Sequence, residues 1–425
     1  MVWIMIGLFA GLLLIGVPIG FSLIIASVFG LWVFDIPLMQ LIQGLYSGIN
    51  SFPFLAVPFF IIAGSLMETG GISLRLVNLC RGMLGHVRGG LGMAVVVSEV
   101  LFSGISGSAV ADASAIGSTM LPAMKRAGYS VEHSVSIVTA SAGMGVLIPP
   151  CLSMIVLASI ADLSVAALFL SGFLPGFFQA VALMALIYYQ ARKGILPGGE
   201  EAFSIRRLAK ASRHAIIPMI MPVIIFGGIF SGAATATEVA VLAVVYALIV
   251  GLVIYREFKI SDIPKMLVDM ALIVGSVTMV VGGAMLFAWL LTVQHVPEIL
   301  RGLILPLSSN PYIFLVIANL AFMLLGAVIE PLPALLILYP ILFPVAKGLL
   351  IHPLHFALLA IASTAIGSVL PPIGILLIVT SSIGKTSLSS VSMPMLPYVA
   401  ILFATLLVIM FNPWLVLLLP KLLYY

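Results

Sequence analysis

Charged residues are scarce in this chain. Of its 425 residues only 8% are Asp, Glu, Lys or Arg, against about 25% in an average soluble domain. Apolar residues make up 63%, and the mean hydropathy is +1.31. A soluble chain needs far more polar surface to cover its core. The composition therefore excludes a soluble protein and predicts an all-α protein that crosses a lipid bilayer many times.

Other features that the sequence lacks exclude further classes of protein. Two cysteines, Cys80 and Cys151, cannot form a disulfide framework. The net charge is only +4 and the basic residues lie in short loops, which excludes nucleic-acid binding. The N-terminal residues carry neither a basic region nor a cleavage site of small residues. We therefore expect the first membrane helix here, and not a removed signal peptide.

Long uncharged runs predict the membrane-spanning segments, each of which needs about 20 apolar residues. These segments fall near 2–33, 52–69, 132–158, 166–191, 214–231, 236–256, 262–292, 354–382 and 392–418. Two further apolar stretches, 91–124 and 311–350, are interrupted by Gly and Pro. Basic residues cluster after the second span, after 91–124, in the polar linker 192–213 and after 236–256.

The positive-inside rule makes these basic loops cytoplasmic. Threading the spans then places the N-terminus in the cytoplasm and the C-terminus in the periplasm. This topology requires both interrupted stretches to be re-entrant hairpins that return to their starting side.

An internal repeat organises the chain. A shift of 222 residues superimposes Gly104 on Gly326, Pro122 on Pro344, Lys125 on Lys347, His133 on His355, Ala140-Ser141 on Ala362-Ser363, Gly145 on Gly367 and Pro149-Pro150 on Pro371-Pro372. The halves 1–191 and 236–425 each contain a hairpin followed by a broken helix. Between them, 192–235 holds a linker and an extra span, so the halves enter from opposite sides. This pattern predicts the inverted-topology repeat of many secondary transporters.

The interruptions in the repeat are the candidate ion sites, because non-helical backbone in a membrane lines cavities or lies buried in protein. Hydroxyl and freed carbonyl oxygens suit a Na⁺ ion. The first predicted Na⁺ site comprises Ser103, Ser106, Gly145, Ile148 and Pro149. The second, whose hairpin tip lacks serines, comprises Gly326, Gly367, Ser368 and Pro371.

Intramembrane carboxylates are candidate functional groups. Asp112 and Glu330 follow the two hairpin tips, and each could bind a cation, carry a proton or order its hairpin. With Ser108 they are the candidate substrate-contacting residues, which places the substrate between the tips. For Glu99 and Glu238 we favour structural roles.

Other classes of protein fit less well. Cys151 and His133 are 18 residues apart on one predicted helix, about 27 Å, which is too far for a nucleophile and its base unless the helix breaks sharply. His352 and His355 have no neighbouring carboxylate or cysteine to complete a metal site. The sequence thus argues against an enzyme. A channel does not need an inverted pair of hairpins with oxygen-rich tips.

Three blocks carry a family resemblance. PFFIIAGSLMETGGISLRL at 58–76 resembles the AG-x-x-M…GI-x-x-R-L signature of the large membrane subunit of tripartite ATP-independent periplasmic (TRAP) transporters. GSAVADASAIGSTMLPAMKRAGY at 107–129 is similar to that family's hairpin signature, with its G-S-A-x-A-D core. GMGVLIPPCLSM at 143–154 is similar to its G-x-x-x-PPS block, and 326–372 to its weaker second copy.

The resemblance implies an elevator-type member of the ion-transporter superfamily in a bacterial inner membrane. Hairpins and broken helices would form the transport domain, and the remaining spans a scaffold. Two or more Na⁺ ions would drive import of an organic acid anion such as sialic acid or a C4-dicarboxylate. A periplasmic binding protein would deliver the substrate, and a separate small four-helix subunit would pack on the scaffold. The alternative is a stand-alone Na⁺- or H⁺-coupled carboxylate symporter.

Two positions depart from the family pattern. Cys151 replaces the serine that follows the first Pro-Pro pair, which puts a hydroxyl ligand there in doubt. Glu330 stands where the family usually has Asp, and Pro331 and Pro333 follow it. The geometry of the second site is therefore expected to differ.

Overall fold

The structure is a computed structural model that describes residues 1–199, 204–299, 302 and 310–423. All secondary structure in these ranges is helical. Seven helices are long and apolar enough to cross a membrane, or up to eight if the bent pair Met39–Ile49 and Pro53–Thr69 is one span. These helices confirm the prediction of an all-α polytopic membrane protein.

The first half of the chain and the segments that follow it contain thirteen labelled α-helices. They are α1 (Val2–Leu14), α2 (Ile19–Val33), α3 (Met39–Ile49), α4 (Ala56–Thr69), α5 (Ile72–Leu84), α6 (Gly90–Ser106), α7 (Ala109–Arg126), α8 (Val131–Gly145), α9 (Leu152–Ile160), α10 (Val165–Arg192), α11 (Ile205–Phe230), α12 (Ala236–Ile249) and α13 (Ile263–Val293). A π-helix, Val250–Ile254, extends α12.

The second half repeats the order of hairpin, broken helix and long helix. Its helices are α15 (Pro311–Val328), α16 (Pro331–Gly348), α17 (Pro353–Ser368), α18 (Ile375–Gly384), α19 (Leu388–Phe411) and α20 (Pro413–Leu423). Four of these begin with proline, whose fixed φ and missing N–H suit the first helical position. Adding 222 to the bounds of α7 gives those of α16. The ends of α6 and α15 and the starts of α8 and α17 also correspond under this shift.

The two broken helices lie side by side and antiparallel. Thr139 of α8 and Thr380 of α18 are joined by a hydrogen bond of 2.6 Å between their hydroxyls. One turn closer to the start of α8, Val135 faces Gly384 at the end of α18. Towards the end of α8, Gly143 faces Val369 in the break between α17 and α18. This contact joins the first arm of one broken helix to the second arm of the other.

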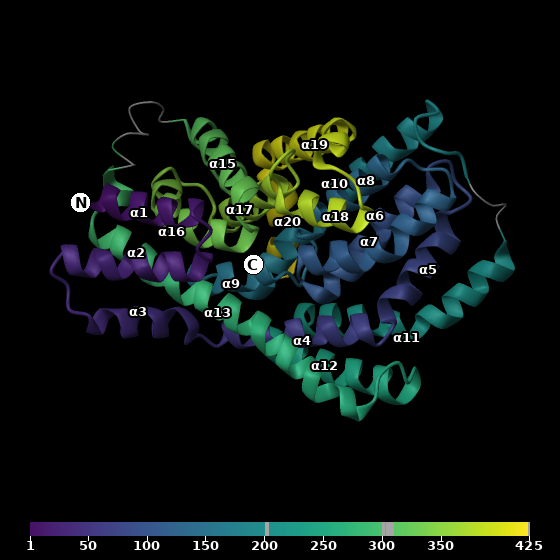
Figure 1. Cartoon of the computed structure of the whole chain (residues 1–425), viewed down its shortest axis with the longest axis horizontal. Coiled ribbons are helices and arrows are strands. Elements are labelled where there is room, and N and C mark those ends of the chain that lie inside the picture. Colours follow the sequence, from purple (N-terminus) through teal and green to yellow (C-terminus); the bar gives the residue numbers. More distant parts are fainter. Residues whose placement is uncertain (200–203, 300–301, 303–309, 424–425) are drawn as a thin grey trace.

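The hairpins flank this antiparallel pair. In Figure 1, α15 and α16 lie on one side and α6 and α7 on the other, with α9, α17 and α18 between them. Helices α3, α4, α12 and α13 run along the lower side of that view. Both hairpins therefore approach the centre of the molecule with their tips.

The predicted single span 2–33 is wrong. The structure has two short helices there, α1 and α2, separated by a turn that includes Gly16 and Pro18. Gly16 has a φ of +85°, a left-handed conformation that ends a helix without the cost of a side chain. At 13 and 15 residues, each helix is about 20 Å long and too short to cross the hydrocarbon core alone.

The first two helices have a defined direction relative to α13. Along α2, Gly20 faces Met279 and Gly30 faces Leu290, so α2 runs parallel to α13. Gly30 also faces Met5, near the start of α1, so α1 runs antiparallel to α2. The N-terminus consequently lies at the same end of the molecule as the C-terminal end of α13. The prediction of a cytoplasmic N-terminus depended on a single membrane crossing by residues 2–33. Because the structure has two short antiparallel helices there, it does not support that prediction.

The predicted last span 392–418 also differs. It is divided between α19 and α20 at Asn412, whose φ and ψ of −126° and 78° are not helical. Pro413 then starts the next helix. Because both segments are uncharged up to Lys421, hydropathy alone could not separate them.

Candidate functional site

The first hairpin contacts the break between α8 and α9 through polar atoms. Ser103, in the last turn of α6, is buried and donates its hydroxyl hydrogen to the carbonyl oxygen of Gly145, at 2.7 Å. The backbone N–H of Ile148 donates to the same oxygen, at 2.8 Å. A Cβ on Gly145 would lie 3.0 Å from the Ser103 oxygen, so glycine there permits the approach.

Two glycines of the hairpin tip let the backbone itself touch the broken helix. A Cβ on Gly104 would lie 3.1 Å from the carbonyl oxygen of Pro149. Gly107 has a φ of +67°, which favours glycine, and its carbonyl accepts a hydrogen bond from the N–H of Leu152, at 3.2 Å. The hairpin tip is therefore held against the break by its backbone as well as by Ser103.

The first predicted Na⁺ site is thus assembled in part. Ser103 and Gly145 touch directly, and Ile148 and Pro149 lie beside the same hairpin at Gly104. The Ser106 side chain lies outside the described residues. Ion binding at this site stays a prediction.

The second hairpin makes the equivalent contact by backbone alone. A Cβ on Gly367 would lie 2.9 Å from both the Ala327 nitrogen and the Gly326 carbonyl carbon. Ser368 turns its hydroxyl back to the Ala365 carbonyl of its own helix, at 2.7 Å. The turn also differs from the first, because Ile329 is extended where Gly107 is left-handed.

The remaining predicted residue of the second Na⁺ site is Pro371, which is half-buried in the break after α17. The structure thus brings Gly326 to Gly367. The hydroxyl of Ser368 bonds within α17 and not to the hairpin. Whether the four form an ion site stays a prediction.

A cavity of about 270 Å³ lies where the two hairpin tips, the first broken helix, α4 and α13 meet. Ser108 and Glu330, the residues that precede α7 and α16, both line it. Asp112 is fully buried in the first turn of α7 and is not part of this lining. Two of the three predicted substrate residues therefore face one cavity between the hairpin tips.

Sequence reasoning missed several polar groups of this cavity. They are Ser65 and Glu68 of α4, Ser153 of α9 and Ser276 of α13. Helices α4 and α13 carry no interruption that would have singled out their residues, whereas Ser153 lies just after the break at Pro149 and Pro150. Cys151, noted as a departure from the family pattern, also lines the cavity. The described lining contains no Lys, Arg or His.

The two remaining intramembrane carboxylates behave differently from one another. Glu238 accepts hydrogen bonds from the backbone and hydroxyl of Thr235, both at 2.8 Å, and completes a capping box at the start of α12. Its predicted structural role is consistent with these bonds. Glu99 of α6 is fully buried, and neither of its carboxylate oxygens has a hydrogen-bond partner among the residues that the structure describes.

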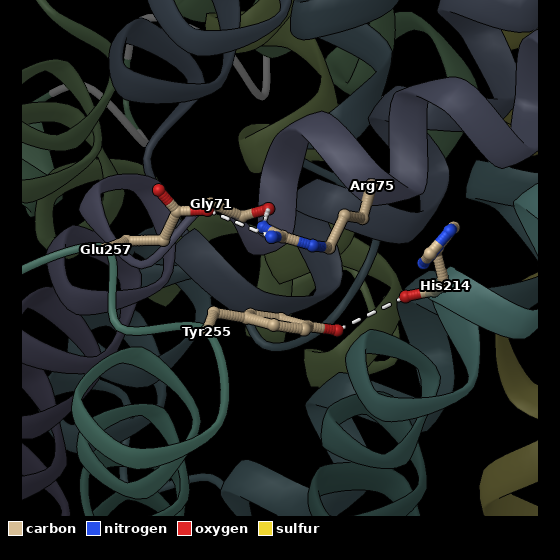
Figure 2. Close-up of polar contacts among 5 residues, drawn as sticks. All are labelled: Gly71, Arg75, His214, Tyr255 and Glu257. Carbon is tan, nitrogen blue, oxygen red and sulfur yellow. Dashed lines mark hydrogen bonds and ion pairs between the residues drawn. The ribbon is translucent and has the colours of Figure 1, made fainter.

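Helix α5 connects α4 to the first hairpin. Figure 2 shows Arg75 of α5 lying over the ring of Tyr255, with its guanidinium carbon 3.6 Å from the ring centroid. The same guanidinium donates to the Gly71 carbonyl, at 2.7 Å, and pairs with Glu257, at 2.9 Å. Tyr255 donates to the His214 carbonyl, at 3.2 Å. These contacts anchor the start of α5 to α11 and to the loop after α12.

The Tyr255 phenol is neutral in this arrangement. Burial raises the pKa of Tyr255, and the positive charge of Arg75 acts in the opposite direction. Because the phenol keeps its proton, it can donate to His214 while its ring face attracts the guanidinium.

Known proteins match nearly the whole chain. The family model described as "Tripartite ATP-independent periplasmic transporter, DctM component" matches residues 6–415. The sialic acid TRAP transporter large permease protein SiaM of Vibrio cholerae is 36% identical over 413 residues, 97% of this chain and 96% of that protein. The C4-dicarboxylate TRAP transporter large permease protein DctM of Pseudomonas aeruginosa is 35% identical over 377 residues, 89% and 88%.

One further relative is named for a different substrate, and a solved structure shows the fold. The 2,3-diketo-L-gulonate TRAP transporter large permease protein YiaN of Escherichia coli is 34% identical over 420 residues, 98% of each chain. The crystal structure of the YdaH transporter of Alcanivorax borkumensis superimposes with a TM-score of 0.65 at 13% identity, over 89% of this chain and 88% of that one. The latter match shows a shared fold.

Paired hairpins, broken helices and a cavity between the hairpin tips are features of a multi-pass membrane transporter, and the matching proteins are transporter permeases and not enzymes. The chain belongs to the DctM family, the large permease subunits of TRAP transporters. Membership implies a tripartite system with a small membrane subunit and a periplasmic binding protein. The predicted resemblance to this family is confirmed.

Proposed function

We propose that this chain imports an organic acid anion into the bacterial cytoplasm, driven by Na⁺, after a periplasmic binding protein delivers it. The substrate class is that of sialic acid or the C4-dicarboxylates, which are named for two relatives. One observation carries the proposal. The cavity lies between the tips of both hairpins, and the first hairpin touches its broken helix through a hydroxyl and a carbonyl oxygen.

The proposed mechanism is an elevator. The moving domain comprises the hairpins α6–α7 and α15–α16 and the broken helices α8–α9 and α17–α18. We add α10 and α19, which the sequence assigned to the scaffold. Helix α19 packs on α8 and α10 packs on α17, and buried Tyr398 of α19 donates to Gln190 of α10, at 2.6 Å. The cavity then lies where this domain meets α4 and α13.

Electrostatics favour joint movement of substrate and ion. The N-terminal ends of α7 and α16 reach the cavity at Ser108 and Glu330, and their partial positive charge attracts a carboxylate. Bound Na⁺ would offset further negative charge. A bare charge in lipid is costly, so the domain crosses with both bound or with neither.

The helix directions suggest a revised topology. Lys259 and Lys265 flank the start of α13, so the positive-inside rule places that start in the cytoplasm. The N-terminus, at the opposite end of α13, would then be periplasmic. The predicted periplasmic C-terminus is retained.

The test is uptake into proteoliposomes that contain this chain and its small membrane subunit. The binding protein is added outside with candidate organic acids and an inward Na⁺ gradient. Uptake that needs both Na⁺ and the binding protein is expected. Uptake without the binding protein would favour the stand-alone symporter, and uptake that ignores Na⁺ would contradict the ion assignment.

A further inference from the structure

We propose that the carboxylate of Glu99 is an anionic ligand of the cation bound at the first hairpin. The inference rests on the proposed Na⁺ coupling and deepens it, because it adds a charged ligand to a site otherwise built from neutral oxygens. The site would then comprise the Glu99 carboxylate, the Ser103 hydroxyl and the Gly145 carbonyl.

Burial and position carry the inference. Glu99 is fully buried, and it lies four residues before Ser103 on α6, so both side chains project from the same face of the helix. A Cβ on Gly145 would lie 3.6 Å from one Glu99 oxygen and 3.0 Å from the Ser103 oxygen. The carboxylate is therefore directed at the same glycine, at the end of α8, that Ser103 contacts.

The missing partners make a purely structural role costly. Neither Glu99 oxygen has a hydrogen-bond partner among the described residues. Its electrostatic neighbour is a second buried carboxylate, Asp112 of α7, and the two repel one another. An ionised carboxylate without a partner is among the most expensive groups to bury. A bound cation removes this cost for Glu99.

The surrounding atoms suit a hard cation. Carboxylate, hydroxyl and carbonyl oxygens are the ligands that such ions take. The Ser103 hydroxyl hydrogen now points at the Gly145 carbonyl. On ion binding it would turn away, so that both oxygens direct lone pairs at the ion beside Glu99. The Glu99 carboxylate would thereby neutralise the Na⁺ charge within the moving domain.

The test measures ion binding without transport. The chain is purified with its small membrane subunit, and its thermal unfolding temperature is followed as NaCl replaces choline chloride at constant ionic strength and pH. A ligand that binds only the folded state raises this temperature progressively once its free concentration exceeds its dissociation constant. We expect Na⁺ to raise it for the wild type. For Glu99→Gln, the Na⁺ concentration that produces a given rise should be at least tenfold higher.

Two variants separate a ligand from a structural residue. Glu238→Gln is the control, because Gln can replace Glu in a capping box, and it should keep the wild-type response. Glu99→Gln should be at least as stable as the wild type in choline chloride, since it loses no hydrogen bond and removes a buried charge. A clear loss of stability there would show a structural role and overturn the proposal.

The remaining outcomes are equally decisive. An unchanged Na⁺ response in Glu99→Gln overturns the Glu99 assignment but leaves Na⁺ coupling intact. A wild type that ignores Na⁺ and is stabilised by lowered pH instead would make Glu99 a proton site. That result would overturn this proposal and the Na⁺ coupling together.

Discussion

At the scale of single residues, the hydroxyl of Ser103 is a side-chain link between the first hairpin and its broken helix. We predict that Ser103→Ala combined with Ser106→Ala raises the Na⁺ concentration for half-maximal uptake, because it removes both hydroxyls of the proposed Na⁺ site. The measurement is uptake at varied Na⁺ with saturating substrate. Ser118→Ala is the control, since the Ser118 hydroxyl bonds only within α7, to Ala115, at 2.9 Å. Unchanged Na⁺ dependence in the double variant would disprove the site.

A second residue-scale prediction concerns Gly367. A Cβ there would collide with the Met323 carbonyl oxygen and lie 2.9 Å from the Ala327 nitrogen. Because backbone cannot move aside as a side chain can, Gly367→Ala should cost about 1–3 kcal/mol or more of stability. Thermal unfolding in detergent measures the loss. Gly7→Ala has open space around it and should change the unfolding temperature little; equal effects would contradict the packing argument.

The sequence predicted the neighbours of single residues correctly where the internal repeat marks the same position twice. Gly145 and Gly367 were predicted beside the hairpins because both end a broken helix, and both lie there. For Glu99 the sequence favoured a structural role, since an apolar run around a carboxylate does not show whether the carboxylate has a hydrogen-bond partner in the fold. Glu68 was missed because α4 has no interruption to mark the depth at which it meets the cavity.

At the scale of elements, α5 is the connection between α4 and the first hairpin. It is a helix over Ile72–Leu84, and its buried residues are Ile72, Leu76, Val77 and Cys80. Its start is anchored by Arg75, and its length packs on α6 and α11. Such an arm would transmit force between a fixed and a moving part.

We predict that Arg75→Lys lowers the maximal uptake rate several-fold and leaves the half-saturating substrate and Na⁺ concentrations unchanged. Lysine keeps the charge but lacks the flat guanidinium that both stacks on Tyr255 and reaches Glu257. The stability cost should stay near or below about 1 kcal/mol, because the pair is partly exposed. The exposed Arg88 supplies the control variant, Arg88→Lys. A wild-type rate in Arg75→Lys would rule out the anchoring role.

Some helix boundaries could be predicted from the sequence and others could not. Hairpins and broken helices were predictable because each is marked twice, at positions related by one shift. The pair α1 and α2 has no second copy in the repeat and no charge, so it was taken as one span. Gly16 and Pro18 together carried the missed signal, a helix end followed at once by a helix start.

At the scale of the whole molecule, the two halves interlock. Helix α8 packs on α18 and α19, and α10 packs on α17 and α20. We predict that 1–192 and 204–425, produced separately, are each degraded, because each leaves the packing surface of the other uncovered. Produced together in one cell, they should accumulate and restore uptake. The measurement is membrane abundance of each fragment, and stable accumulation of 1–192 alone would contradict the prediction.

The hydrogen bond between Thr139 and Thr380 has a consequence for biosynthesis. Its partners are 241 residues apart, and ribosomes add about 5–20 residues per second. The first broken helix therefore waits roughly 12 to 50 s in the membrane before its antiparallel partner is made. During that interval its hydroxyls and the backbone of the break at Pro149 and Pro150 lack their final packing partners and must be kept from contact with lipid. The nascent first half of this chain is accordingly a candidate client for a membrane insertase or an intramembrane chaperone.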